Sequence, residues 1–333
     1  DRCHSTRMQR LVLLILFTTF LPGCYYLQAA KGQWDLTRKR EPIADVLAAA
    51  DTSPELAARL RLVQEARQFS IDELKLPDNK SYRTYADIER DYVVWNVFAA
   101  PEFSMEAKTW CFPVAGCVSY RGYFAKEGAE RQARRLADKG YDVAIGGVAA
   151  YSTLGKFDGP LLSTMMSWDD ARLVGVLFHE LAHQVLYVKG DSGFNESFAT
   201  AVEEFGVRRW LETHKNAGEV EKYLQRRQLR QDLMALVAEA REMLQAVYES
   251  AVSDDEKRTM KSKRLSLLAA DVAALLEASG RDPGGWLSGE LNNARLVSMT
   301  LYEGRLPEFR ALFDKCEQRI ECFYAEARAL AGR

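Results

Sequence analysis

The sequence is poor in several features that would indicate other classes of protein. Its 333 residues include only four histidines, and 45 lysines plus arginines nearly balance 47 aspartates plus glutamates, for a formal charge of −2. Without a basic excess there is no field that would attract phosphates, so nucleic acid is not an expected partner. The Gly-x-Ser-x-Gly turn of serine hydrolases is absent, as are internal repeats and low-complexity segments. What remains is an ordinary globular composition, 47% hydrophobic and 28% charged.

Two of the four histidines form the motif His179-Glu180-x-x-His183. Apolar residues at helical spacing from Ala171 to Val188 predict a helix here, although an amphipathic helix with incidental polar residues is the alternative. Residues four apart lie on one helical face, so His179 and His183 can present two imidazoles to one ion. Catalytic zinc sites use three protein ligands and keep one position for water. We therefore predict one Zn²⁺, with Glu180 as the general base that takes a proton from the activated water.

The third ligand has to come from beyond the first helix. Residues 189–193 include two glycines suited to a tight reversal, and a second helix is predicted to begin near Asn195. That helix would bring Glu196 back toward the histidines. Asp191, in the turn, is a competing ligand. Leu186 and Lys189 stand where a metzincin would have Gly and His or Asp, so that type of site is not expected.

The string from Asn195 to Glu203 reads Asn-Glu-Ser-Phe-Ala-Thr-Ala-Val-Glu. It resembles the Asn-Glu-Gly-Phe-Ala…Glu string of alanyl-aminopeptidase-like zinc peptidases, the gluzincins. The resemblance implies Glu196 as the third zinc ligand. Glu203 shares its helical face and is expected to accept the N–H of a ligand histidine, with Asn195 as a further residue behind the ligands. The alternative for Glu203 is a solvated surface glutamate.

The chain departs from gluzincins in two places. Twelve residues separate His183 from Glu196, fewer than in that group, so we expect a tighter connection between the two helices. Alanyl aminopeptidases also carry a Gly-x-Met-Glu-Asn strand whose glutamate grips the substrate amine. The comparable place here is residues 146–150, which read Gly-Gly-Val-Ala-Ala, so the glutamate is missing.

A wider resemblance covers most of the chain. It rests on Trp110-Cys111-Phe112-Pro113, Gly116, Tyr120-Arg121-Gly122-Tyr123-Phe124, Ala150-Tyr151-Ser152-Thr153-Leu154-Gly155, the histidine motif and Asn292-Asn293-Ala294. Together these strings resemble a bacterial family of lipoprotein-type predicted aminopeptidases. The name of that family itself rests on the zinc motif, so the resemblance supports the fold and says little about the substrate.

The N-terminus predicts the compartment. We expect residues 1–7 to lie upstream of the true start, at Met8, and residues 1–24 to hold a secretory signal. Its apolar run covers residues 11–21, which is shorter than the roughly 20 residues that a membrane-spanning helix needs. Leu-Pro-Gly-Cys at its end resembles a lipobox, so Cys24 is the predicted lipidation site, with an ordinary cleaved signal or short anchor as the alternative. We expect a lipid anchor in the bacterial envelope, on the periplasmic face of the outer membrane, and a tether over residues 25–40.

Four cysteines remain for the exported part of the chain. Cys111 and Cys117 could form a disulfide around the loop that separates them. Cys316 and Cys322 are predicted to share one helix, where a spacing of six is too long for a bridge, so we expect two buried small apolar residues.

The predicted fold is α+β and zincin-like, mostly helical, with a small mixed sheet before the metal helix. It forms a single metallopeptidase domain over residues 41–331. Strands are expected at 92–99, 108–113, 119–124 and 142–148, and helices within 42–76 and at 127–139. After the site, residues 220–278 predict a long antiparallel helical hairpin, and a final helix is expected at about 307–331.

A zinc peptidase also needs a donor for the developing oxyanion. Tyr302 is our first candidate, because related peptidases place such a tyrosine C-terminal to the zinc helix. The other candidates are Tyr120, Tyr123, Tyr151 and Arg121, each of which could instead be a packed aromatic or surface residue.

The sequence thus predicts a zinc-dependent metallopeptidase that acts on peptides, with the aminopeptidase subtype implied by the family resemblance. Two alternatives stay open: an envelope-anchored endopeptidase, and a non-catalytic helical lipoprotein scaffold with a structural or vestigial metal. Another divalent ion could replace zinc. The oligomeric state and side-chain preference are not predicted.

Overall fold

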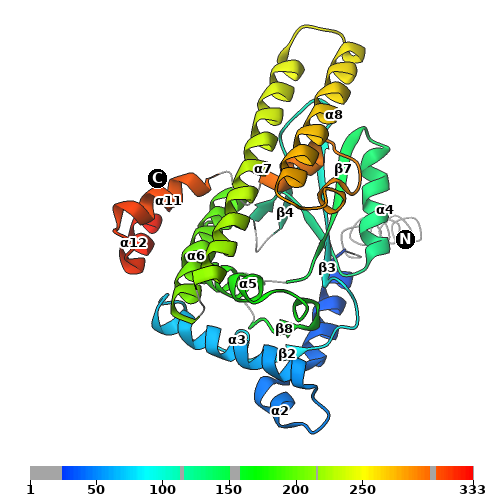
Figure 1. The fold of residues 1–333 in the computed structure, drawn as a ribbon. Coiled ribbons are helices and arrows are strands. Elements are labelled where there is room, and N and C mark those ends of the chain that lie inside the picture. Colours follow the sequence, from blue (N-terminus) through cyan, green and yellow to red (C-terminus); the bar gives the residue numbers. More distant parts are fainter. Residues whose placement is uncertain (1–24, 113–115, 151–157, 215–216, 301–304, 333) are drawn as a thin grey trace, which may run out of the picture.

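The computed structural model describes residues 25–112, 116–150, 158–214, 217–300 and 305–332. The described chain is mixed α+β and mostly helical, as predicted, and its strands all precede the helix of the histidine motif (Figure 1). The strands are β1 (Arg40–Pro42), β2 (Thr84–Ala86), β3 (Val94–Pro101), β4 (Trp110–Phe112), β5 (Gly116–Val118), β6 (Arg121–Tyr123), β7 (Tyr141–Val148) and β8 (Leu161–Leu162). The helices among them are α2 (Ile43–Ala48), α3 (Pro54–Asp72) and α4 (Lys126–Ala137). The later helices are α5 (Asp170–Ala182), α6 (Ser192–His214), α7 (Ala217–Glu249), α8 (Asp254–Ala278), α9 (Gly284–Leu287), α10 (Asn293–Thr300), α11 (Leu306–Lys315) and α12 (Ile320–Ala331).

In the part of the chain that the structure describes, the strands form three small sheets rather than the one predicted. In the described ranges their orders are β1-β2-β8, β6-β3-β7 and the hairpin β4-β5. Only the first is mixed, because β2 pairs with β1 antiparallel and with β8 parallel. Strand β3 pairs with β7 along its whole length, and its residues are buried on both sides except for Trp95 and Pro101. Val97 and Ala99 pack under α4, and the alternate residues Phe98 and Ala100 pack against α10, as the period of two requires.

The segment predicted as a tether is helical. Residues 25–38 form a helix that packs on the domain, and Leu36 is buried there. Tyr25 packs against the rings of Phe112 and Tyr123. Gly32 lies so close to Phe124 that a Cβ at this position would overlap that ring. None of the helices in the described ranges is both long and apolar enough to cross a bilayer.

Helices α5 and α6 lie side by side in the largest apolar core. Helix α5 begins after Asp169, whose side chain accepts a hydrogen bond from the backbone N–H of Arg172, and it ends at Ala182, before the predicted Val188. Helix α6 begins at Ser192, slightly before the predicted Asn195. The two helices approach closely at Gly206, where a Cβ would meet the ring of Phe178 at 2.7 Å.

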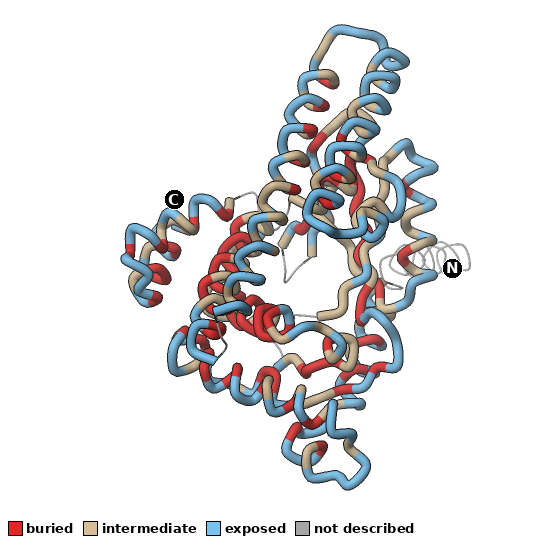
Figure 2. Tube along the Cα trace, viewed as in Figure 1, coloured by how far each residue is buried: buried red, intermediate tan, exposed pale blue. Residues whose placement is uncertain are grey.

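The predicted hairpin is present as α7 and α8. It rises from the body of the molecule and is largely exposed along its length (Figure 2). Ser253 and Glu256 form a capping box that starts α8. A polar clamp fixes the hairpin to the sheet: Lys261 pairs with Asp142 at 2.6 Å, and the same carboxylate accepts the backbone N–H of Asn293. The Asn292-Asn293 string therefore joins β7, α10 and the hairpin.

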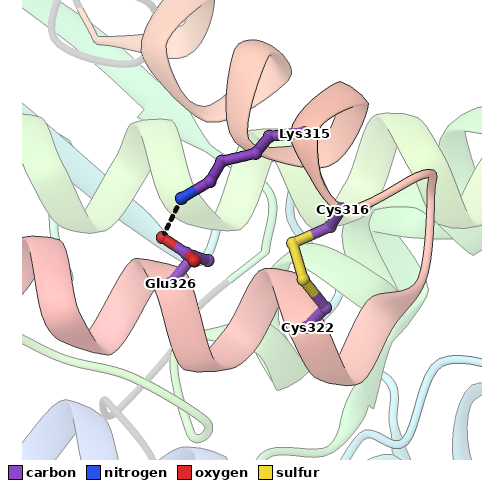
Figure 3. The surroundings of a disulfide bond; sticks show 4 residues. All are labelled: Lys315, Cys316, Cys322 and Glu326. Carbon is purple, nitrogen blue, oxygen red and sulfur yellow. Dashed lines mark ion pairs between the residues drawn. A yellow bond between two sulfur atoms is a disulfide. The ribbon is translucent and has the colours of Figure 1, made fainter.

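The prediction for the last two cysteines was wrong. The helix expected at 307–331 is interrupted after Lys315, because Glu317 and Gln318 have left-handed backbones with φ of 52° and 58°. The reversal brings Cys316 next to Cys322 on α12, and the two form a disulfide (Figure 3). An ion pair of 2.9 Å between Lys315 and Glu326 also joins the two helices.

Cys111 and Cys117 also form a disulfide, which closes the β4-β5 hairpin. Both cysteines are exposed, whereas Cys316 is fully buried. The two bridges have the same sequence separation of six residues, so they constrain the unfolded chain equally.

Removing the Cys316–Cys322 bridge should therefore destabilise the protein more than removing the other one. By loop entropy alone each double Cys→Ala variant should lose about 2 kcal/mol of unfolding free energy. The Cys316→Ala/Cys322→Ala variant should lose more, because it also removes buried sulfur from the α11–α12 contact. Denaturant unfolding of both variants measures the difference. Equal losses would contradict a packing role for Cys316.

Candidate metal centre

Three side chains from α5 and α6 converge at one buried point. The helical turn from His179 to His183 places both imidazoles on the side of α5 that faces α6, and Glu196 faces them from the first turns of α6. The Nε2 atom of His179 lies 3.2 Å from Oε2 of Glu196, and the Nε2 atom of His183 lies 3.7 Å from the same oxygen. One potential ligand atom from each residue lies within 4.8 Å of the other two.

This geometry fits a metal ion. Ligand atoms about 2.1 Å from a tetrahedral zinc ion lie about 3.4 Å apart, and the two distances to Glu196 bracket that value. Two imidazole nitrogens and one carboxylate oxygen are also a donor set found in catalytic zinc sites. The three residues could hold one metal ion.

Glu203 orients the first histidine. Its Oε2 lies 3.1 Å from Nδ1 of His179, so the ring can donate its Nδ1 proton to Glu203 and turn Nε2 toward Glu196. This is the contact expected of a carboxylate behind a ligand histidine. Gly175, one turn before His179, makes room for it: a Cβ there would lie 3.1 Å from Oε1 of Glu203.

The pKa values of the three residues reflect their close packing. Burial lowers the pKa of His179, but hydrogen bonds to Glu196 and Glu203 outweigh it and raise that pKa well above its usual value. Burial lowers the pKa of His183 to about 4, despite the nearby charge of Glu196. Burial raises the pKa of Glu196, whereas the two histidines lower it, and the net direction is downward. His183 and Glu196 are thus held in the neutral and anionic forms that bind metals.

A buried arginine organises the loop on the other side of the motif. Arg67 of α3 donates to the backbone oxygens of Pro77 and Ser81, and so holds residues 77–81 in place. The amides of Asn79 and Gln184 then bond each other at 2.5 Å, and Gln184 also donates to the hydroxyl of Ser81. Since Gln184 follows His183, this loop is joined directly to the end of the motif.

The loop ends in a tyrosine that the sequence analysis did not identify. Tyr82 has a left-handed backbone, with φ of 61°, and its side chain is buried. Burial raises the pKa of its phenol well above the usual value, and the charge of Glu180 raises it further. Tyr82 therefore lies close to the predicted general base. Nothing in the local sequence distinguishes it from a core aromatic.

Tyr187 is a second tyrosine that the sequence analysis missed. Burial raises the pKa of its phenol, and the nearby carboxylate of Glu196 adds to the effect. Tyr187 is only partly buried, unlike Tyr82. Its one sequence signal is its position four residues after His183, inside the predicted helix, although α5 ends at Ala182 and Tyr187 lies in the connection that follows.

The other residues named for the site have different positions. Tyr302 and Tyr151 lie outside the described residues. Tyr123 is buried beside Val97 under α4, Tyr120 packs against Phe98, and Arg121 lies over the ring of Tyr25, all on or beside the β6-β3-β7 sheet.

Asn195 and Asp191 shape the connection between the two ligand helices. The amide of Asn195 accepts from the N–H of Val188 and donates to its carbonyl, so it fixes the connection rather than a ligand. Asp191 accepts the N–H of Phe194 at the start of α6 and pairs with Arg305. Its carboxylate is used in the turn, which leaves Glu196 as the third member of the buried group.

Glu203→Gln should weaken metal binding by roughly 10–100-fold, because the amide is a poorer acceptor for the Nδ1 proton of His179. Competition for zinc with a chromogenic chelator measures the zinc affinity of each variant. Glu212→Gln is the matched control, since it removes a carboxylate from an exposed position of the same helix. Unchanged affinity in the Glu203 variant would contradict the orienting role.

Comparison with known proteins gives the family of the chain. No curated protein and no solved structure matches it. A family model described as "Putative aminopeptidase" matches residues 24–333, which include every residue of the metal centre described above. A match of this length covers the sheets, the ligand helices and the hairpin together. The chain therefore belongs to this putative aminopeptidase family.

Proposed function

We propose that the chain is a zinc-dependent metallopeptidase of zincin-like, gluzincin type, and that it acts as an aminopeptidase. The observation that carries the proposal is the buried convergence of His179, His183 and Glu196 beside an intact Glu180. The donor set favours zinc over harder ions such as Mg²⁺, which prefer oxygen ligands alone. The family match supports the aminopeptidase subtype and peptides as substrates.

Glu180 supplies the general base in this proposal. A bound zinc ion would lower the pKa of its water to about 7. Glu180 follows the ligand His179 on α5 and takes the proton of the attacking water as the new C–O bond forms. It then returns that proton to the amine that leaves when the peptide C–N bond breaks. Glu203 continues to accept the hydrogen bond from Nδ1 of His179 during the reaction, so the imidazole ring does not rotate.

Tyr187 is the proposed donor for the developing oxyanion. Its raised pKa keeps the phenol protonated at neutral pH, so the O–H can donate to a negatively charged oxygen. It lies close enough to Glu196 for that charge to act on it, and it is more accessible than Tyr82. Tyr82 is assigned to the buried wall behind Glu180.

The envelope is the proposed location. The charged start, the apolar run at 11–21 and Cys24 support a lipid-anchored protein on the periplasmic side of the outer membrane. The two disulfides of the described chain are compatible with an oxidising compartment.

Glu180→Gln should keep the metal and lose hydrolysis. We expect a fall in kcat of roughly 10²–10⁴-fold, because the amide cannot accept a proton. Elemental analysis of the purified variant, followed by an assay on peptides with free amino termini, measures both quantities. Turnover at the wild-type rate would eliminate this mechanism.

The same assay separates the proposed activity from its alternatives. An aminopeptidase cuts peptides with a free amino terminus and leaves N-blocked peptides intact, and a chelator abolishes the reaction. Internal cleavage of blocked peptides would indicate an endopeptidase. Bound metal without any cleavage would indicate a non-catalytic scaffold.

Tyr187→Phe should lower kcat by roughly 10²-fold and leave metal content unchanged, because one oxyanion donor is lost. Tyr82→Phe is the matched control, since it removes the same hydroxyl from the buried side of the site. Steady-state kinetics on a free-amine peptide compares the two variants. A larger loss in the Tyr82 variant would reverse the two assignments.

A further inference from the structure

Among the residues that the structure describes, no element covers one apolar face of the helix of residues 25–38. Its exposed large side chains are Tyr26, Leu27 and Trp34, of which Leu27 is 68% and Trp34 63% exposed. Leu27 and Trp34 are seven residues apart, so they lie almost in line along the helix. Gly32 and Leu36, which pack on the domain, lie on the opposite side. The helix is therefore anchored by one face and presents aromatic and aliphatic groups on the other.

Basic side chains border this apolar face. Lys31 and Arg38 are exposed on the same side of the helix as Trp34. They also line a cavity of about 710 Å³ between the helix and residues 124–125, together with Lys39 and Arg90. The guanidinium of Arg90 is held there by the backbone oxygens of Phe124 and Val93. Asp35 is the acidic residue among those that line the cavity, and Lys39 pairs with Glu89 at 3.3 Å, so Lys31, Arg38 and Arg90 leave the balance of charge positive.

We propose that this face lies in the interface of a bilayer that contains anionic phospholipids. Helices of this kind place Trp and Leu at the boundary between headgroups and acyl chains, and Lys and Arg beside the phosphates. Tyr26, Leu27 and Trp34 enter the boundary in this arrangement. Lys31 and Arg38 face the headgroups, and the cavity rimmed by Lys39 and Arg90 admits a headgroup phosphate.

The charge of the face favours a membrane over a second copy of the chain. A symmetric dimer through this helix would set Lys31 and Arg38 against their own copies, and like charges at close range oppose association. The position of the helix in the chain also favours a membrane as the partner. The described part of the helix follows Cys24 directly and lies shortly after the apolar run of 11–21, so any membrane attachment of that segment brings the helix to the bilayer surface.

A docked helix does more than an anchor does. A single lipid or apolar segment holds a protein near the membrane without fixing its orientation, whereas a docked helix is a second contact that fixes which side faces the bilayer. Because the helix is packed on the domain through Leu36, Gly32 and Tyr25, the orientation of the helix sets that of the domain.

The experiment uses the full chain reconstituted into vesicles, so that all samples are equally close to the membrane. An environment-sensitive fluorescent amino acid replaces Leu27 or, as the matched control, Leu267, which is 47% exposed on α8. The vesicles are phosphatidylcholine, alone or mixed with phosphatidylglycerol, and carry brominated acyl chains as quenchers. On the mixed vesicles we expect a blue shift and loss of emission at position 27, and neither at position 267.

A second pair of variants tests the role of charge. Lys31→Gln/Arg38→Gln should restore much of the emission at position 27 on the mixed vesicles, whereas Lys263→Gln on the hairpin should not. Cleavage of a soluble peptide should stay at the wild-type rate in all of these variants, which separates this test from that of the proposed activity. Emission at position 27 that matches position 267 on both kinds of vesicle would overturn the proposal. So would quenching that is insensitive to Lys31 and Arg38.

Discussion

The hydrogen-bond chain from Glu203 through His179 to Glu196 is the interaction on which the rest of the site depends. It crosses the contact between α5 and α6 twice, because His179 stands on one helix and both carboxylates on the other. Both helices are buried over most of their length, so their separation is fixed by packing rather than by the polar groups. Gly175 and Gly206 allow the close approach, since a side chain at either position would meet the neighbouring helix.

The surrounding structure supports this pair of helices from several sides. Glu204, the neighbour of Glu203, pairs with Arg227 at 2.5 Å and with Arg310 at 2.8 Å, and so joins α6 to α7 and α11. These groups are mostly buried, and removal of one partner would leave an uncompensated charge. Arg67 performs a similar task for the loop that meets the end of the motif. One polar network thus fixes α6 beside Glu203, and the other fixes the loop that meets the end of the histidine motif.

Local patterns predicted much of this architecture. The apolar spacing around His179 predicted the helix, and the glycines at 190 and 193 predicted a reversal that returns the chain to it. The hairpin followed from two long amphipathic segments, and the structure adds the cap that Ser253 forms at the start of the second. In each case the signal and the element lie in the same stretch of chain.

Other features had no such signal. The break between α11 and α12 occurs at Glu317 and Gln318, which rarely adopt left-handed backbones, so neither glycine nor proline marked the turn. The loop that delivers Tyr82 is held by Arg67 and is joined to the motif by the bond between Asn79 and Gln184, which are 105 residues apart in sequence. The division of the strands into three sheets likewise depends on pairings such as β2 with β8, which are remote in sequence.

The space shared by Gly175 and Glu203 has a consequence for how this family can vary. The carboxylate that orients His179 occupies the volume that a larger residue at position 175 would need, since Oε1 and Cγ of Glu203 lie 3.1 and 3.3 Å from the Cβ that alanine would introduce. The two positions should therefore evolve as a pair. Relatives with alanine at 175 are expected to carry the shorter aspartate at 203, and substitutions at the two sites to be non-additive.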